Sequence, residues 1–510
     1  MKGGLSSITR ITIAVILGIA SCKILILSID IEVWELLVAS VVFLACMFLL
    51  NRKTTPLAFG LATFLFSATF GALIFLSQFH SIRDGADIRT NSLVSGMVIK
   101  KPERKAKTWA TRISTSEGTQ ILAYLSEECP PSVGDSVELS CPYGMTPTYM
   151  GDNPDSAYAD YRNYLFYSGI SATVFSGKGQ WKITKHNEHK NLINRLASLQ
   201  DLMNDYYDES GFIGDEGAII RVMTTGDKSK LGKGLRKDYS HAGVAHVLAL
   251  SGFHLTIIYS ILDLLFLSFV ISYKWRNIAR LFIILIIFAF TIIVGCPASL
   301  VRASVMCGIM MLTKILQQEN SSLNSLSLTA LIMLVCNPML LFDVGFQLSF
   351  VSMLGIIVFS PILTGIMPIR QKILHKLWEM VSITVACSIF TLPLITYYFG
   401  YIPLLSIVSN LSIPILATAL LWLSAIWWLS FAFTDIQSII GNCMKWISGV
   451  MNSIAGWISS MEWSVILIHS NLFGVLMEYV LLLLLVICSL KLSLSHLINF
   501  HKLIIITNIA

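Results

Sequence analysis

Long apolar runs dominate the chain and recur in two groups, the first before residue 80 and the second beginning near Ala245. Each run approaches the roughly 20 residues that an α-helix needs to cross about 30 Å of hydrocarbon. We therefore expect an α-helical polytopic membrane protein with about ten to twelve spans. The candidate spans are residues 8–29, 33–50, 57–79, 246–271, 279–294, 299–316, 323–341, 346–363, 377–398, 402–433 and 473–489.

Two apolar segments allow more than one interpretation. Residues 440–463 are apolar on one face but include Lys445 and Glu462, so this segment either spans the membrane or lies at its surface. Ile19 to Cys22 is similar to a lipoprotein cleavage box, which would replace the first span by a lipid anchor. The apolar run continues to Ile29, and this favours a membrane helix.

The composition supports lipid as the main solvent, because 55% of the residues are hydrophobic and only 13% are charged. A soluble protein carries about 25% charged residues. Basic residues gather in loops that can share one face of the membrane, and the positive-inside rule assigns that face to the cytoplasm. These residues are Lys2, Arg10, Arg52, Lys53, Lys274, Arg276, Arg280, Lys314, Arg370, Lys372 and Lys376. We therefore expect a multi-pass protein of the inner membrane.

The stretch from about residue 80 to 239 then lies on the periplasmic or extracellular side. Between residues 93 and 183 it contains short runs typical of strands, separated by turn residues. Five strands with one helix at 157–168 predict a small exported β-barrel of the OB type. The strands are expected at 93–99, 108–114, 119–125, 136–141 and 171–175. An amphipathic helix at 187–208 follows, which we expect on the membrane surface or over the mouth of the bundle.

The pattern therefore predicts four parts, with the soluble insert between two membrane regions. They are N-terminal transmembrane helices at 1–80, the OB-like domain at 81–185, interfacial helices at 186–240 and a transmembrane channel bundle at 241–510.

One stretch of the exported domain is strongly basic. Between Gly96 and Arg112, six cations face the single acid Glu103, a net charge of six minus one, or +5, and Trp109 lies among them. The cations are Lys100, Lys101, Arg104, Lys105, Lys107 and Arg112. Basic groups that follow phosphates beside an aromatic ring that stacks on a base are typical of single-strand binding. The alternative is a solvated hairpin tip.

Eight of the ten cysteines lie in or beside apolar runs, where cysteine usually behaves as a small hydrophobic residue. The other two, Cys129 and Cys141, fall in the exported domain, where oxidation is permitted. We expect a disulfide between them.

A series of motifs carries a family resemblance. The turn Gly226-Asp227-Lys228-Ser229 precedes a histidine-rich segment from His241 to His254 that contains Leu-Ala-Leu-Ser-Gly-Phe-His. Further blocks follow in order. They are Gly295 to Ala303, Asn337-Pro338, Asp343 to Phe350 with Gly-Phe-Gln-Leu-Ser-Phe, and Asn410 with Pro414 after Pro393; Asn153-Pro154 and Asp160 to Leu165 lie upstream. Together they resemble the ComEC family of bacterial competence proteins.

The resemblance implies a channel that passes one DNA strand from the outside to the cytoplasm. It also implies a cytoplasmic motor and an exported DNA receptor as partners. Many ComEC proteins end in a metallo-β-lactamase-like nuclease, whose two metals need a clustered H-x-H-x-D-H. After Pro414 the histidines are only His469, His496 and His501. We therefore expect no nuclease here and a separate enzyme for the other strand.

Several polar residues at membrane depth are candidates for lining the channel. Such groups are costly and usually face a bundle interior or a water-filled path. On a continuous helix, His246, Leu250 and His254 would stack at i, i+4 and i+8. The full set is His246, Ser251, Gly252, His254, Arg302, Asp343, Gln347 and Asn410. The alternative is hydrogen bonding between packed helices.

Arg302 needs a partner if it lies at membrane depth, because an unpaired charge there costs roughly 2.5–3.5 kcal/mol. Asp343 is the best acidic candidate, since it precedes Gln347 by four residues on what would be one helical face. Asp263 and a DNA phosphate are the alternatives.

Two other function classes remain open. A secondary transporter of another solute would use broken helices near Gly295 and between Pro403 and Pro414. A membrane hydrolase would use Ser251, and a zinc site could draw on His241, His246 and His254, but neither spacing favours the chemistry. We expect no enzymatic activity, no metal and no cofactor. The chain lacks a G-x-x-x-x-G-K-(S/T) motif, so energy for transport must come from elsewhere.

Overall fold

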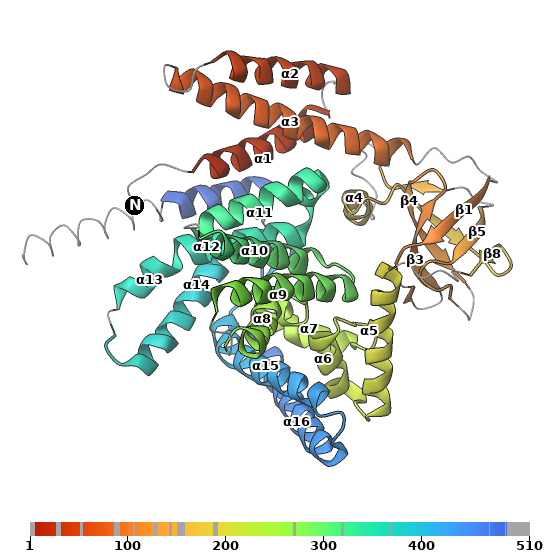
Figure 1. Ribbon diagram of the computed structural model, residues 1–510. Helices are drawn as coiled ribbons and strands as arrows, with labels where there is room; N and C mark the ends of the chain where they lie inside the picture. Colours follow the sequence, from red (N-terminus) through yellow and green to blue (C-terminus); the bar gives the residue numbers. More distant parts are fainter. Residues whose placement is uncertain are drawn as a thin grey trace, which may run out of the picture. The chain divides into compact units, whose positions relative to one another are not determined.

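The computed structural model (Figure 1) is mainly helical and divides into two compact units. The first unit comprises residues 1–200 with 319–346, and the second comprises residues 201–318 with 347–510. The described residues are 6–26, 32–50, 55–85, 92–100, 102–105, 108–126, 130–141, 145–149, 159–186, 192–268, 272–317, 321–367, 369–468, 470–484 and 486. The predicted four-part division stays a prediction.

In the first unit, three N-terminal helices pack with a helix from much later in the chain. The helices are α1 (Ser7–Ile26), α2 (Val33–Leu49), α3 (Pro56–Asp84) and α11 (Ser322–Cys336), followed by the short η2 (Pro338–Phe342). Glycines allow α1 and α3 to approach closely: an added Cβ at Gly18 would lie 1.9 Å from the Ala68 carbonyl oxygen. Small residues at such contacts are typical of membrane helices. The Thr12 hydroxyl donates to the Ser327 carbonyl at 3.0 Å and joins α1 to α11.

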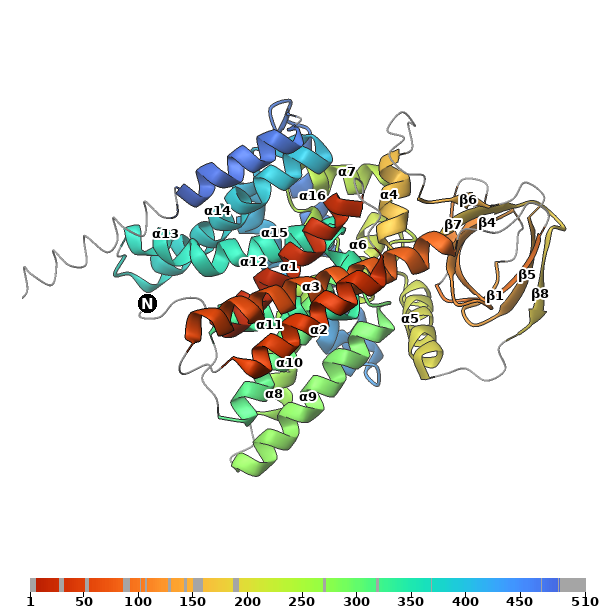
Figure 2. The same ribbon diagram turned by 90° about the horizontal axis from the view of Figure 1, so that it is seen from above.

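The first unit also contains an eight-stranded mixed sheet. Its strands are β1 (Ser92–Val98), β2 (Glu103–Arg104), β3 (Trp109–Thr115), β4 (Gln120–Leu125), β5 (Ser136–Cys141), β6 (Thr146–Pro147), β7 (Ala172–Ser176) and β8 (Trp181–Lys185). Their order is β6-β7-β4-β3-β1-β5-β8, and β2 pairs with β3. Figure 2 shows that the sheet is strongly curved, with β1, β5 and β8 facing β4, β6 and β7. Helix α4 (Ala159–Tyr167) connects β6 to β7.

The five predicted strands are confirmed as β1, β3, β4, β5 and β7, and the predicted helix as α4. The alternation of apolar and polar residues explains this success, because the apolar ones, such as Ile113, Ile121 and Leu139, form the core enclosed by the curved sheet. The short β2 and β6 and the terminal β8 were not predicted. Among the described residues, the terminal strands β6 and β8 of this order do not pair with each other, so the structure shows a curved, open sheet. Closure into an OB-type barrel stays a prediction.

The second unit is a helical bundle. Its helices are α6 (Gly214–Thr224), α7 (Lys233–His241), η1 (Ala245–Val247), α8 (Gly252–Phe266), α9 (Tyr273–Ile293), α10 (Ala298–Ile315), α13 (Ser360–Ile366), α14 (Lys372–Phe399), α15 (Ser406–Leu429), α16 (Thr434–Ser459) and most of α12 (Val344–Val358). Helix α5 (Leu192–Glu209) ends in this unit, and β9 (Tyr401–Pro403) pairs with β10 (Val465–Leu467). A core around Tyr207, Trp427 and Met451 joins α5, α6 and α7 to α15 and α16.

Among the described residues, seven helices are long and apolar enough to cross a membrane. They are Ser7–Ile26, Pro56–Asp84, Lys274–Ile293, Ala298–Ile315, Val344–Ile366, Lys372–Phe399 and Ser406–Leu429. The chain is therefore a multi-pass membrane protein. The expectation of about ten to twelve spans exceeds this number, because several apolar runs form helices shorter than a full crossing. These are Val33–Leu49, Gly252–Phe266, Ser322–Cys336 and Leu472–Leu484.

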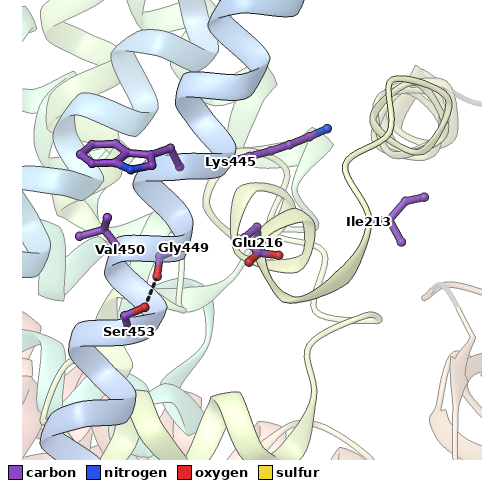
Figure 3. A pocket seen from close by; sticks show the side chains of 7 residues that line it. Ile213, Glu216, Lys445, Gly449, Val450 and Ser453 are labelled. Carbon is purple, nitrogen blue, oxygen red and sulfur yellow. Dashed lines mark hydrogen bonds between the residues drawn. The ribbon is translucent and has the colours of Figure 1, made fainter.

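The segment left open at 440–463 mostly belongs to α16, which packs along α15 and is not among the seven. Its exposed face carries Trp446 and Trp457. A pocket of about 480 Å³ lies where α16 passes the start of α6. Glu216 and Lys445 are among the lining residues that Figure 3 shows. The Lys445 ammonium lies 5.1 Å from the centre of the Phe212 ring. No residue predicted to line the channel borders this pocket.

A buried guanidinium fixes α5 against α6. Arg221, almost fully buried, donates through both terminal nitrogens to the Asp208 carboxylate and through one of them to the Phe212 carbonyl. The Lys230 ammonium lies 2.7 Å from both Asp208 oxygens. The hydrogen bond from Arg221, with that from Lys230, lowers the pKa of Asp208 to about 2.

This lowered pKa predicts a pH dependence. A carboxyl group whose pKa is lower in the folded state stabilises the fold above its unfolded pKa of about 3.9 and loses that contribution as pH falls toward 2. Thermal unfolding in detergent should therefore show a nearly constant midpoint between pH 8 and 5 from this group, and a falling one below about pH 4. Asp208→Asn should lower the midpoint at neutral pH, because it leaves the Arg221 charge buried without a carboxylate. Asp215→Asn, at an exposed position at the start of α6, is the control. An unchanged midpoint in Asp208→Asn would contradict the structural role of this pair.

Candidate functional site

Three of the motif segments meet at the turn that follows α6. Gly226 has a φ of +76°, and an added Cβ would lie 2.6 Å from Leu250 Cδ1 and 2.7 Å from Val294 Cγ1. The turn therefore touches both the segment before α8 and the end of α9. Asp227 stabilises it locally, since its carboxylate accepts the Ser229 N–H at 2.9 Å and the Ser229 hydroxyl at 2.8 Å. The close approach of Leu250 and Val294 explains why a glycine stands at the head of the motif.

A graded set of alanine variants tests this packing. Gly226→Ala adds both left-handed strain and a clash, and should cost about 2–4 kcal/mol of stability. Gly295→Ala, at φ +86° with open space around it, should show the strain alone. Gly232→Ala, with open space and an ordinary φ, should be nearly neutral. Thermal unfolding of the purified proteins would measure the order, and equal effects at Gly226 and Gly232 would contradict the close contact.

Helix α8 begins at a polar cap. Ser251 is extended at φ −132° and ψ 178°, and its backbone N–H donates to His254 Nδ1 at 3.3 Å. The Ser251 hydroxyl lies 3.3 Å from the same nitrogen. Because Nδ1 accepts a hydrogen bond, the neutral imidazole carries its proton on Nε2. His254 is 0% exposed, and its Nε2 has no hydrogen-bond partner among the described residues. The start of α8 thus holds a buried donor that is not satisfied.

Arg302 on α10 lies against this same helix start. Its guanidinium donates to the Ser349 carbonyl and lies 5.7 Å from the centre of the Phe350 ring. An added Cβ at Gly252 would be 3.6 Å from Arg302 Nη2, so the glycine leaves room for the guanidinium at the first turn of α8. Arg302 is only 7% exposed. It brings a buried positive charge to the positive end of a helix dipole.

Within the second unit, and among the described residues, Arg302 forms no ion pair with a carboxylate. The suggestion of Asp263 as its partner is wrong: Asp263 accepts the Tyr259 hydroxyl at 3.1 Å, one turn away on α8 itself. Asp343 belongs to the other unit, so its pairing with Arg302 stays a prediction. The guanidinium is thus held by a carbonyl and an aromatic ring, and no described carboxylate of its own unit neutralises it. This arrangement is suited to an anionic ligand.

Further hydrogen bonds tie the motif segments together. The Ser299 hydroxyl at the start of α10 donates to the Leu250 carbonyl at 2.7 Å, before α8. The Ser409 hydroxyl, in the first turn of α15, donates to the Ala242 carbonyl after α7. Asn410 is therefore positioned in the first turns of α15, where it is half-buried.

The predicted polar stripe on one helix is wrong. His246 lies in the separate η1, and the extended Ser251 interrupts the chain before α8, so His246 and His254 do not share a helical face. His246 is exposed, whereas His254 is buried. The expectation that Asp343 and Gln347 share a helical face is also wrong, because Asp343 is extended and precedes α12. The Asp343 carboxylate accepts the Phe346 N–H at 2.8 Å at the start of α12, and Gln347 accepts the Tyr398 hydroxyl at 3.0 Å.

The hydrolase and zinc interpretations gain no support. Ser251 and His254 are close, but their contact is that of a helix cap, and no third group orients the imidazole among the described residues. Over the same residues, no group of three or more His, Cys, Asp or Glu side chains could hold a metal ion.

The basic hairpin of the sheet is partly neutralised by its own acid. Lys100 lies 3.0 Å and Lys105 3.5 Å from the Glu103 carboxylate. Burial alone raises the pKa of Glu103, but the attraction of the two ammonium groups outweighs it and lowers that pKa below its usual value. Arg104 lies 5.8 Å from the centre of the Trp109 ring, which packs on the inner core of the sheet.

The structure describes only some of the remaining basic residues and of the cysteines in the predicted disulfide. Arg112 on β3 donates to the Ser168 carbonyl at 3.3 Å. Lys101, Lys107 and Cys129 lie outside the described residues, as does the side chain of Cys141, so the disulfide stays a prediction.

The sequence interpretation missed Ser349 and Phe350 as the contacts of Arg302. Both lie inside the quoted Gly-Phe-Gln-Leu-Ser-Phe motif, two and three residues after Gln347. Their place directly after the polar residues of that motif is the signal that could have identified them.

Comparisons with known proteins agree with these motifs. A sequence model of the family described as Competence protein matches residues 223–492, more than half of the chain. ComE operon protein 3 of Bacillus subtilis (strain 168) is 24% identical over 321 residues, which are 62% of this chain and 37% of that relative. The match thus spans well under half of the relative's length. No solved structure matches the chain significantly. Because this model covers more than half of the chain, including the segments that meet at Gly226 and Arg302, the chain belongs to the Competence protein family.

Proposed function

We propose that this protein is the inner-membrane conduit that passes a single strand of DNA into the cytoplasm during natural transformation. The observation that carries the proposal is the buried Arg302 guanidinium at the start of α8, in a chain of the Competence family. Among the described residues of its unit, this guanidinium has no carboxylate partner. A positive group held in this way matches the phosphates of a DNA backbone.

The conduit would be lined by polar groups of the motif segments. Polar side chains and backbone groups that lack a hydrogen-bond partner are tolerated at membrane depth where they line a water-filled path. The break between η1 and α8 and the turn at Gly295 before α10 supply such backbone. The proposed lining residues are His246, Ser251, Gly252, His254, Arg302, Asp343, Gln347 and Asn410.

We propose that the curved sheet faces the periplasm or the exterior, receives the strand from a DNA receptor, and hands it to the conduit. A cytoplasmic motor would pull the strand, and a separate nuclease would degrade the other one. The membrane lipid is the protein's solvent in this scheme, and the protein itself performs no chemistry.

DNA capture by the basic hairpin has a measurable salt signature. Binding of short single strands to the full-length protein in lipid nanodiscs should weaken with salt, with a log-log slope of about −0.7 per phosphate contact, roughly −2 to −4 in total. Replacing Lys100, Lys101, Arg104 and Lys105 with serine should flatten the slope. Glu103→Gln is the matched control, and it should steepen the slope because it frees Lys100 and Lys105 from their acid. Binding that does not depend on salt would mean that the hairpin is only a solvated loop.

A secondary transporter is the alternative, because broken helices also form the substrate sites of such proteins. The two functions separate in a strain that lacks this gene. We expect transformation to fail while uptake of labelled small solutes is unchanged. Normal transformation together with the loss of one solute's uptake would favour the transporter.

A further inference from the structure

A row of aromatic rings, most of them exposed, crosses the outer face of the sheet. Tyr124 on β4 and Phe175 on β7 are partners in the parallel register. Their rings stack with centres 4.7 Å apart and planes 8° apart. Phe175 is 62% exposed. The inner face of the same strands is filled by residues such as Ile121 and Val174, so this stacked pair is not part of the core of the sheet.

The row continues onto α4, which lies over the same face. The Tyr124 hydroxyl is 3.0 Å from the Tyr161 hydroxyl, and the Tyr161 and Tyr164 rings are 6.3 Å apart in a stacked arrangement. Tyr161 is 47% exposed and Tyr164 is 51% exposed. Leu165, on the buried side of the same helix, packs on Leu122 and anchors α4. The aromatic row, defined as Tyr124, Phe175, Tyr161 and Tyr164, thus has a half-buried base at Tyr124 and exposed rings at the other three positions.

The strand register places the basic hairpin beside the aromatic row. Glu103 pairs with Ala110, and Ala110 pairs with Tyr124, so one line of partners runs from β2 through β3 and β4 to Phe175 on β7. Neighbouring strands are about 4.8 Å apart, so the hairpin backbone lies on the order of 10 Å from that of Tyr124. The lysines held by Glu103, Lys100 and Lys105, therefore border the stacked rings on the same side of the sheet.

Adjacent cations and exposed rings match one kind of occupant. A single nucleic acid strand presents a line of phosphates and a line of bases, and bases stack on aromatic side chains without regard to sequence. Paired strands hide the faces of their bases, so a duplex does not fit this surface. Trp109, the ring first suggested for stacking, packs on the inner core and has Arg104 over it, so it is less available than the row.

We infer that the aromatic row is the base-stacking surface on which the sheet holds single-stranded DNA, with the basic hairpin contacting the phosphates. This inference rests on the proposed function and adds the residues that hold the bases. It assigns no preference for base sequence, because every base offers a face for stacking.

The test uses the full-length protein in nanodiscs and a thymidine oligonucleotide that carries 5-iododeoxyuridine. Phe175→Ala, Tyr161→Ala and Tyr164→Ala should each weaken binding about five-fold or more, with no change in salt slope. The ring-preserving variants Phe175→Trp, Tyr161→Phe and Tyr164→Phe should stay within about two-fold of wild type. Phe399→Ala, at an exposed ring of the second unit, is the control. Ultraviolet cross-linking followed by peptide mass spectrometry should identify residues of the row.

The possible outcomes distinguish a failure of this inference from a failure of the proposed function. Cross-links at Trp109 with unchanged binding of the three alanine variants would overturn the inference and leave DNA capture intact. Labelling of the row by a photoactivatable lipid in the nanodisc, without labelling by the oligonucleotide, would show that it faces lipid and would also overturn it. No binding of single strands by the wild-type protein would overturn both.

Discussion

Replacing Arg302 with methionine is expected to lower transformation by about 100-fold or more while the amount of protein in the membrane stays near wild type. The loss would follow from removing the proposed contact between this buried charge and a phosphate. Truncating one partner of such a pair costs about 2–5 kcal/mol, and about 2.7 kcal/mol corresponds to 100-fold. The fold should tolerate the change, because methionine fills a similar volume and no carboxylate of the second unit is left unpaired among the described residues.

Two further variants sharpen this test. Arg302→Lys keeps the charge but loses the planar guanidinium, which can donate to the Ser349 carbonyl and to a phosphate at the same time. This variant should therefore give an intermediate loss of transformation. Arg280→Met removes a cation that bonds to Asn277 at 2.8 Å on α9, and it should leave transformation unchanged. Normal transformation in Arg302→Met would remove Arg302 from the conduit. Disappearance of the protein in both Arg302 variants would mean that the role of the guanidinium is structural.

Replacing His254 should separate two functions of one imidazole. His254→Asn retains an acceptor for the Ser251 N–H but removes the buried Nε2 donor, whereas His254→Leu removes both. A buried donor without a partner costs about 1–3 kcal/mol, so its presence calls for a function. We expect both variants to lower transformation by about 30-fold or more, corresponding to about 2 kcal/mol.

The two variants should differ in stability. Only His254→Leu should lose about 1 kcal/mol, through loss of the cap. Thermal unfolding of the purified proteins measures this difference, and membrane abundance is the control for the transformation result. If His254→Asn transforms normally, the imidazole serves only to begin α8, and the conduit is lined by other groups.

The sequence predicted elements well where alternation or long apolar runs decide the structure. The five strands and α4 were found because inward residues such as Ile113 and Leu139 alternate with outward ones. The break before α8 was missed, because hydropathy is continuous from Ala245 onward and does not register a cap. The pairing of Ser251 with His254 three residues later was the available signal, since a residue at that position can return a hydrogen bond to the cap.

The contacts of Arg302 could not be predicted from the sequence for a different reason. A backbone carbonyl such as that of Ser349 has no signature in the sequence, so the search for a partner considered only acids. Asp343 was read as part of a helix face, although an aspartate directly before an apolar helix is also a common cap, and its carboxylate accepts the Phe346 N–H. Several motif segments do contact one another around Gly226 and Arg302, but the roles of their residues depend on backbone geometry.

The most direct test of the conduit follows labelled DNA to its compartment. Competent cells that lack this gene are given end-labelled DNA, treated with external nuclease, and fractionated into cytoplasm and the space outside the inner membrane. We predict that labelled DNA accumulates outside the inner membrane, that the wild-type gene restores a labelled single strand in the cytoplasm, and that Arg302→Met does not. Arrival of the single strand in the cytoplasm of cells without the gene, at the wild-type level, would contradict the proposed function.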